Sequence, residues 1–198
     1  MSTILYTALA FFLLIASPLR AFAQEDVVRK LLLDRDREIK AMLGDKAELT
    51  EAESDDLKQL INGQIDFERM ARTALGPQWD PLTPEQRTEF VNVFSEIVKG
   101  QSLADLSIYR LKMTVGKISI DSDSAHVETS TLYKEKPMQV AYALGFRNDE
   151  WRVDDIILDG VSTTEGYARS FQTYVRKRGF DALLASLQKK LDKMSATG

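Results

Sequence analysis

Residues 113–158 decide the fold of this chain, and they read MTVGKISIDSDSAHVETSTLYKEKPMQVAYALGFRNDEWRVDDIIL. The stretch holds four segments rich in alternating, β-branched and aromatic residues, which are 113–120, 124–133, 138–147 and 150–158. Such segments are typical of β-strands. The turn sequences between them, DSD, EKP and ND, are short. Because short connections join neighbouring strands as antiparallel hairpins, the stretch predicts an antiparallel sheet.

The segment 138–147 predicts which face of that sheet is buried, because its two faces differ. One face carries large apolar side chains, which are Met138, Val140, Tyr142, Leu144 and Phe146. The other face carries small or polar ones. We expect the apolar face to turn towards helices, where it bounds either a packed core or an apolar cavity. Composition alone does not distinguish these two outcomes.

Helices are predicted on both sides of the sheet in the sequence. Thr50 with Glu53, and Thr83 with Pro84 and Gln86, are capping patterns that begin helices, and Asp66 and Ser162 are further N-cap residues. The expected helices cover residues 27–43, 50–61, 67–75, 84–99, 162–178 and 180–194. The first is amphipathic and is expected to lie on the surface. The helix after Thr83 ends at Gly100 or is only interrupted there before residues 102–111.

The order of these elements predicts the fold class. Helices precede the sheet and helices follow it, which is typical of an α+β domain and differs from the alternation of a wound parallel fold. No internal repeat or low-complexity linker divides the chain. We therefore expect a single α+β domain, with a twisted antiparallel sheet of four to five strands enclosed by N-terminal and C-terminal helices.

Composition excludes several classes of function. The 198 residues include 26 Lys+Arg and 30 Asp+Glu, so the formal net charge is −4 and the chain lacks the cationic excess that nucleic acid binding requires. There is no cysteine and only one histidine, His126. Disulfides, thiolate nucleophiles and Cys- or His-rich metal sites are therefore excluded, and no metal or cofactor is expected. No nucleotide-binding glycine motif is present either.

The N-terminus resembles an export signal. Residues 4–16 are uncharged and mostly apolar, Pro18 follows, and Ala21-Phe22-Ala23 is a small-x-small site for signal peptidase. We expect residues 1–23 to be a signal peptide cleaved after Ala23, and residues 24–198 to form the mature domain. The alternative is an uncleaved anchor, but thirteen apolar residues are fewer than the roughly 20 that a membrane-spanning helix needs.

Candidate catalytic residues have simpler structural interpretations. His126 lies in a predicted strand, where alternation turns it to solvent, and no nucleophile motif accompanies it. Asp154, Asp155 and Asp159 form an acidic group, but neighbours in a strand point to opposite faces, so Asp154 and Asp155 are not expected to share a site. Asp155 is in phase with Trp151, and we expect it on the buried face with a backbone or arginine partner.

Two sequence blocks carry a resemblance to a known family. The first block comprises residues 67–76 (FERMARTALG), Trp79, residues 83–87 (TPEQR) and residues 90–94. The second comprises residues 151–156 (WRVDDI), residues 159–162 (DGVS), Tyr167 and Phe171. Both resemble, in order and spacing, signatures of the MlaC family of periplasmic phospholipid carriers, also called toluene-tolerance proteins. The chain departs from the family pattern after Tyr167, where Ala168 replaces an arginine and Arg169 follows one residue late.

The resemblance implies a carrier whose sheet and helices enclose the acyl chains of a phospholipid. It also implies location in the periplasm, and a monomer that exchanges lipid with an inner-membrane MCE-domain ABC transporter and an outer-membrane lipoprotein–porin complex. The chemistry needs no catalytic residue. The residues expected to line the lipid cavity are Phe90, Phe94, Ile97, Val98, Leu106, Tyr109, Val140, Tyr142, Leu144, Phe146, Val153, Ile157, Tyr167 and Phe171.

Three other functions stay open from the sequence. A hopanoid or another terpenoid lipid is an alternative ligand for the same fold. A periplasmic enzyme that uses Asp155 or Asp159 as a base is a less favoured alternative. The third is an interaction module whose interior is filled by side chains, because large apolar residues at these spacings more often form a packed core than a pocket wall.

Overall fold

The computed structural model describes residues 18–46 and 48–196, with side chains from Gln24 onwards. Within these residues it contains six α-helices, two short 3-10 helices (η) and five strands. They are α1 (Pro18–Leu43), α2 (Glu51–Asn62), α3 (Phe67–Leu75), η1 (Gly76–Gln78), α4 (Pro84–Ser102), η2 (Leu106–Arg110), β1 (Thr114–Asp121), β2 (Ser124–Tyr133), β3 (Lys136–Arg147), β4 (Glu150–Leu158), β5 (Val161–Ser162), α5 (Thr163–Arg178) and α6 (Phe180–Ser195). Residues 1–17 of the expected signal peptide lie outside the described residues, and the expected cleavage site after Ala23 falls within α1.

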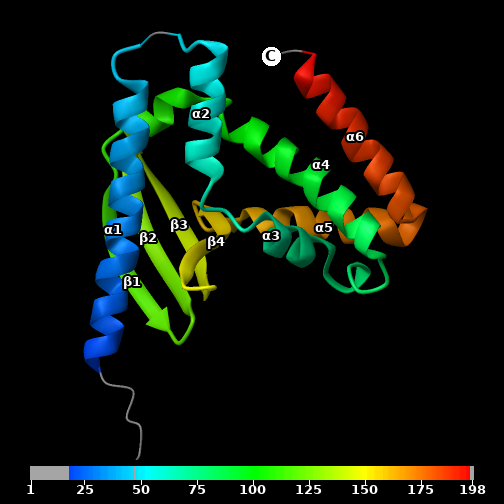
Figure 1. Ribbon diagram of the computed structural model, residues 1–198, viewed down its shortest axis with the longest axis horizontal. Coiled ribbons are helices and arrows are strands. Elements are labelled where there is room, and N and C mark those ends of the chain that lie inside the picture. The colour runs from blue at the N-terminus through cyan, green and yellow to red at the C-terminus, as the bar shows by residue number, and fades with distance from the viewer. Residues whose placement is uncertain (1–17, 47, 197–198) are drawn as a thin grey trace, which may run out of the picture.

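The strands form one antiparallel sheet in the order β1-β2-β3-β4-β5, so each strand pairs with its neighbours in the sequence. The four predicted strands are present with ends that differ by at most two residues, and β5 adds a two-residue edge. The predicted α+β class is confirmed. The six helices cover the sheet at one end and along one edge, as Figure 1 shows.

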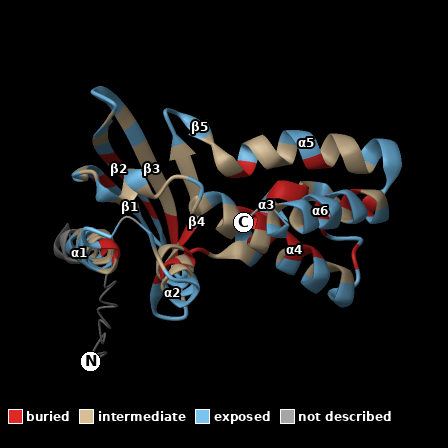
Figure 2. Cartoon of the chain, turned by 90° about the horizontal axis from the view of Figure 1, so that it is seen from above, coloured by how far each residue is buried: buried red, intermediate tan, exposed pale blue. Residues whose placement is uncertain are grey.

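The helices form two groups at opposite sides of the molecule. In both views α1 stands beside β1 at one side of the molecule, and α4, α5 and α6 lie together at the other (Figures 1 and 2). The predicted N-caps are confirmed, with capping boxes at Thr50 and Thr83. Gly100 does not end α4, which runs on to Ser102. A side chain at Gly100 would lie 2.6 Å from Met194 Cε, so the glycine lets α6 approach α4 closely.

The buried apolar residues form two separate clusters. The larger cluster joins α3, α4, α5 and α6 to the sheet, and its centre is a set of aromatic rings that pack edge to face, among them Phe90, Phe94 and Phe171. The smaller cluster is built on Ile39 and Leu43 of α1 and on Leu57 of α2. Two clusters leave a boundary between them, and this boundary holds the candidate site.

A β-bulge in β4 corrects the prediction for Asp155. Val153 pairs with Leu144, but Asp155 pairs with Ala143, so Asp154 is the extra residue of the bulge. Asp155 therefore lies on the face opposite to Trp151 and Val153, and the expectation that it shares their buried face was wrong. Asp154 contacts Arg147 on that same opposite face, where alternation places it, so strict alternation failed for Asp155 alone.

Candidate functional site

An apolar cavity of about 210 Å³ lies between α1 and the sheet, where the two buried clusters face each other. Its walls come from five parts of the chain. They are Leu31, Leu32, Arg35, Asp36 and Ile39 of α1; Ile61, Asn62, Gln64 and Ile65 at the end of α2 and after it; Val98 and Ser102 of α4; Ile108, Tyr109, Leu111 and Met113 around η2; and Thr129, Ser130, Thr131, Met138, Val140, Tyr142, Val153 and Ile156 of the sheet.

Local sequence explains how α1 and the sheet each present an apolar wall. The α1 lining residues recur at intervals of three or four, which places them on one face of the helix. In β3, Met138, Val140 and Tyr142 are alternate residues, so they share one face of the sheet. That face is the one predicted to be apolar, and part of it bounds a cavity instead of a packed core.

Burial keeps the two tyrosines of the cavity uncharged. It raises the pKa of Tyr142 to about 12 and the pKa of Tyr109 to about 12, because the phenolate form would lose its hydration. The Tyr109 hydroxyl donates to the carbonyl oxygen of Ser102 at 3.0 Å. The tyrosines therefore act as amphipathic walls and bring no charge into the cavity.

The charged side chains of the cavity lie on α1 and are only partly buried. Asp36 is paired with Lys40 at 2.6 Å, and Arg35 is paired with Glu38 at 3.2 Å. The Arg35 side chain is 30% exposed and also donates to Gln64 Oε1 at 3.3 Å. This side of the cavity therefore reaches solvent, whereas the wall formed by the sheet is apolar or hydroxylated.

The structure brings five of the fourteen predicted lipid-binding residues together at this cavity: Val98, Tyr109, Val140, Tyr142 and Val153. The other nine lie elsewhere. Phe90, Phe94, Ile97, Tyr167 and Phe171 are packed in the larger core cluster, Leu144 is 2% exposed in the same core, Phe146 packs on Trp151, Leu106 packs against the smaller cluster, and Ile157 lies on the opposite face of the sheet.

The aromatic residues of α4 and α5 lie away from the cavity because their rings pack against one another. The ring centroids of Phe94 and Tyr167 are 5.0 Å apart and those of Tyr167 and Phe171 are 5.2 Å apart. Aromatic pairs at this separation stabilise a packed core.

Arg169, which follows one residue after the position of the family arginine, has a side chain that is 68% exposed. Its Nη1 lies 3.7 Å from Oε2 of Glu165.

Sequence reasoning missed the contribution of α1. The apolar spacing of Leu31, Leu32 and Ile39 was visible, but it predicted a surface helix and gave no sign of what the inner face would cover. Polar lining residues such as Asn62 and Thr131 carried no sequence signal at all. Both depend on how α1 and α2 are placed against the sheet.

Asp155 and Asp159 are both engaged in structural contacts. Asp155 accepts hydrogen bonds from the Thr164 backbone N–H at 3.0 Å, from the Thr164 hydroxyl at 2.7 Å and from the Ser162 hydroxyl, so it ties β4 to the start of α5. Asp159 Oδ1 accepts from the Gln139 backbone N–H at 2.9 Å. Each carboxylate therefore holds backbone or hydroxyl groups of the fold. His126 is exposed, as predicted.

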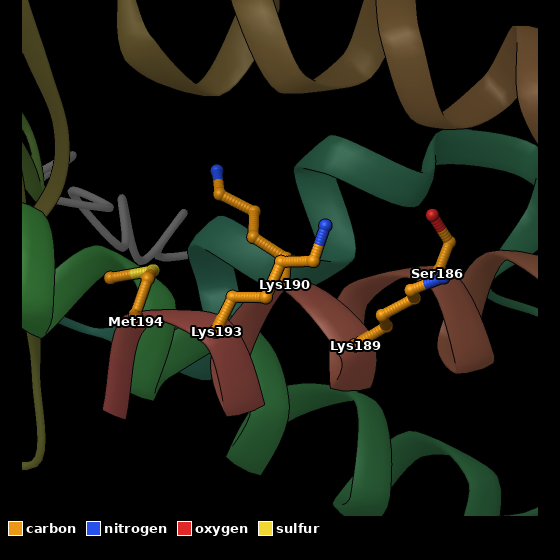
Figure 3. Close-up of a pocket in the computed structure, with 5 residues that line it drawn as sticks. All are labelled: Ser186, Lys189, Lys190, Lys193 and Met194. Carbon is orange, nitrogen blue, oxygen red and sulfur yellow. The ribbon is translucent and has the colours of Figure 1, made fainter. Parts of the chain in front are cut away.

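A second hollow, of about 530 Å³, lies on α6 and has a different character. Figure 3 shows its lining residues, which are Ser186, Lys189, Lys190, Lys193 and Met194. The three lysines occupy positions that share one side of the helix and are exposed. A cationic surface of this kind does not solvate hydrocarbon, so the cavity beside α1 is the candidate site for an apolar ligand.

Among the described residues, no group of three or more His, Asp or Glu side chains is placed to hold a metal ion. Within residues 18–46 and 48–196, no helix combines the length and the apolar character needed to cross a bilayer.

Comparison with known protein families shows to which family the chain belongs. The model of the MlaC protein family matches residues 36–189, which include all the buried residues of the two clusters except Val28 and all the cavity-lining residues except Leu31, Leu32 and Arg35. The chain belongs to the MlaC family. The resemblance noted in the sequence is thereby confirmed over most of its length.

Two relatives extend the MlaC assignment. A solved structure from Ralstonia solanacearum, a phospholipid-binding protein in complex with a phospholipid, superposes with a TM-score of 0.70 at 21% identity and covers 85% of this chain and 96% of that one. The intermembrane phospholipid transport system binding protein MlaC of Haemophilus influenzae is 22% identical over 131 residues, which are 63% of this chain. The matched part spans only 61% of that relative's length.

Proposed function

We propose that this protein is a periplasmic carrier that binds a phospholipid by its acyl chains and moves it between the inner and outer membranes. The observation that carries the proposal is the apolar cavity between α1 and the sheet. Family membership and the phospholipid bound by the Ralstonia solanacearum relative support the choice of ligand.

The energetics of lipid transfer explain why such a cavity is needed. Two acyl chains contain roughly 30 methylenes, and each costs about 0.8 kcal/mol when it is exposed to water. A lipid free in water therefore lies more than about 20 kcal/mol above its state in a bilayer. A carrier has to offset most of this cost with apolar surface, and it needs no nucleophile, base or metal to do so.

We further propose that α1 moves outwards when lipid enters. The cavity volume of about 210 Å³ is below the range of roughly 300–1,000 Å³ that is usual for small-molecule pockets. Two acyl chains need more room than this. Only one face of α1 is turned to the cavity, and its opposite face is mostly charged and lies in solvent. An outward shift of α1 therefore enlarges the cavity; among the buried residues of the larger cluster it withdraws only Val28, and the packing among α3, α4, α5 and α6 stays in place.

We also propose where the protein is located and what it binds. Residues 1–23 act as a signal peptide cleaved after Ala23, residues 24–198 form the mature lipid-binding domain, and the mature protein is a monomer. Its partners are an inner-membrane MCE-domain ABC transporter and an outer-membrane lipoprotein–porin complex. The name of the Haemophilus influenzae relative, a component of an intermembrane phospholipid transport system, supports this set.

Lipid extraction tests the ligand. The mature protein is purified from a Gram-negative host without detergent, and bound lipid is identified by mass spectrometry and quantified against protein. We expect a diacyl glycerophospholipid in near-stoichiometric amount. A hopanoid in its place redirects the proposal to terpenoid lipids, and the absence of lipid, together with failure to take up added phospholipid, contradicts the carrier function.

A further inference from the structure

Cationic side chains gather on the last two helices of the chain. Residues 163–195 contain seven lysines and arginines against three aspartates and glutamates, which is a formal charge of +4. Residues 24–162 contain eighteen against twenty-seven, which is a formal charge of −9. The chain is acidic overall, but α5 and α6, which are joined by the single residue Gly179, form a cationic helix pair.

Each helix of this pair carries a surface hollow that is lined by cations. The α6 hollow contains three lysines, and Figure 3 shows Ser186, Lys190 and Lys193 extending to the same side of the helix. A hollow of about 300 Å³ on α5 is lined by Arg169, Ser170, Thr173, Tyr174, Lys177 and Arg178. Neither set of described lining residues includes a carboxylate. Basic side chains beside hydroxyl groups are a combination that binds phosphate oxygens.

The cations of the helix pair differ from those of α1 in how far they are neutralised. On α1, all five basic residues with described side chains form ion pairs with carboxylates three or four positions away. On the helix pair, Lys177, Lys189 and Lys190 are exposed, and no carboxylate of the described residues lies within 4.0 Å of their ammonium groups. The charged face of α1 is therefore nearly neutral to a partner, whereas α5 and α6 present a positive potential.

The helix dipoles account for only part of this charge. Arg176, Lys177 and Arg178 lie in the last turn of α5, where cations stabilise a helix. Lys189 and Lys190 lie before the last turn of α6, so the dipole does not explain them. Both are exposed, so they do not stabilise the core either.

The composition of the helix pair favours a lipid surface over a protein as its partner. Stable protein interfaces are built around aromatic or aliphatic anchors that become buried. The exposed large apolar residues of the described chain are Val27, Leu33, Leu132, Leu158 and Val161, and none of them lies on α5 or α6. An anionic bilayer requires no such anchor, because its attraction for lysine and arginine depends on charge.

We propose that the cationic helix pair docks the protein on the surface of a bilayer that contains anionic phospholipids. This inference rests on the proposed function, which brings the protein to membranes, but it concerns a surface remote from the lipid cavity. The pair and α1 lie at opposite sides of the molecule (Figures 1 and 2). Docking through α5 and α6 therefore leaves α1 and the cavity accessible to a partner protein.

The charge of the remaining chain gives this docking an orientation. The same bilayer that attracts the helix pair repels residues 24–162, which are strongly acidic. The protein therefore approaches the membrane with α5 and α6 first. The attraction is purely electrostatic, so it weakens as the salt concentration rises.

Binding to vesicles tests the docking surface. The mature protein is mixed with vesicles of phosphatidylcholine alone, or of phosphatidylcholine with about 30% phosphatidylglycerol, and the bound fraction is measured by flotation. We expect binding to the anionic vesicles only. We expect this binding to be lost when NaCl is raised from about 0.05 M to about 0.5 M, because salt screens exposed charges.

Two matched triple variants locate the effect. One replaces three exposed cations of the helix pair: Lys177→Gln, Lys189→Gln and Lys190→Gln. The other makes the same change in net charge at three exposed lysines in and just before the sheet: Lys112→Gln, Lys117→Gln and Lys136→Gln. A cation near an anionic surface contributes about fivefold in affinity, or about 1 kcal/mol. We therefore expect the first variant to bind anionic vesicles about a hundredfold more weakly, and the second to bind as the unchanged protein does.

The outcomes separate this inference from the proposed function. Equal weakening in the two triple variants overturns the docking surface, because net charge alone then governs binding. Failure of the unchanged protein to bind anionic vesicles also overturns it, and an acidic protein is then the remaining partner for the helix pair. Phospholipid in the cavity is quantified on the same preparations. We expect both variants to keep it, whereas an empty cavity in the unchanged protein refutes the carrier function whatever the vesicles show.

Discussion

Filling the cavity from the sheet side separates a lipid-binding space from a solid core. Val140 is half-buried and lines the cavity, whereas Leu144, four residues further along the same face of β3, is 2% exposed in the packed core. Val140→Trp therefore places an indole ring in the cavity, and Leu144→Trp forces the same ring into a region without space. The two variants form a matched pair.

The expected loss of lipid affinity follows from the groups displaced. Tryptophan has about seven more side-chain heavy atoms than valine, and if each displaces roughly one methylene of the bound chain, about 5–6 kcal/mol of burial is lost. That corresponds to roughly four orders of magnitude in affinity. Because neighbouring side chains and α1 adjust, we expect a loss of at least about a hundredfold, and a free energy of unfolding within about 1 kcal/mol of the original value.

The assay measures lipid and stability on the same preparations. Phospholipid that copurifies with each variant is quantified against folded protein, and the free energy of unfolding of the lipid-free form is measured in urea. We expect Leu144→Trp to lose about 1–3 kcal/mol or more of stability through overpacking, while the folded fraction keeps its lipid.

The opposite pattern refutes the reasoning. If Val140→Trp retains as much lipid per folded molecule as the unchanged protein, acyl chains do not occupy this space. If both variants lose the same stability, the region beside α1 is as densely filled as the core around Leu144, and the interaction-module alternative gains support.

Three further substitutions test other parts of the structure. Burial raises the pKa of Tyr142 from 10.0 to about 12, so the unfolded chain loses this proton at a lower pH than the folded protein does. The free energy of unfolding should therefore fall between about pH 10 and 12. Tyr142→Phe should reduce that fall by up to about 2 kcal/mol, measured in an alkaline titration followed by circular dichroism. Asp155→Asn should cost about 2–4 kcal/mol in urea, because its new N–H groups face the donors of Thr164, and unchanged stability would contradict the structural role. Gly145→Ala introduces a Cβ that clashes with Arg147 Nη1 and should cost about 1 kcal/mol by thermal unfolding without changing lipid content, since it lies on the opposite face of the sheet.

Much of the fold could be predicted because its signals are local. The caps at Thr50, Thr83 and Ser162 are confirmed because a capping hydrogen bond involves residues only three apart in the sequence. The strands were found because a period of two residues and short turns are visible without any tertiary information. The phase of β4 was not predictable, because the bulge at Asp154 depends on pairing with β3 and carries no sequence signature.

The cavity itself was only partly predictable. Val140 and Tyr142 were assigned to the apolar face of β3, and the structure places both in the cavity wall. Phe90 and Phe94 are equally apolar, but they find partners in α5 and α6, which a single sequence does not reveal. Whether a large apolar residue packs against protein or bounds an empty space depends on the distance between elements far apart in the chain.

The sequence by itself determined the elements, the fold class, the family and the absence of cysteine chemistry, because these follow from residue types and from spacings of a few positions. Only the tertiary structure decided that α1 stands off from β3 and β4, that the space left there is apolar, and that Arg35, Asn62 and Thr131 meet around it. The physical reason is that a cavity is a property of unfilled volume between distant segments, and no local pattern of side chains encodes what is missing between them.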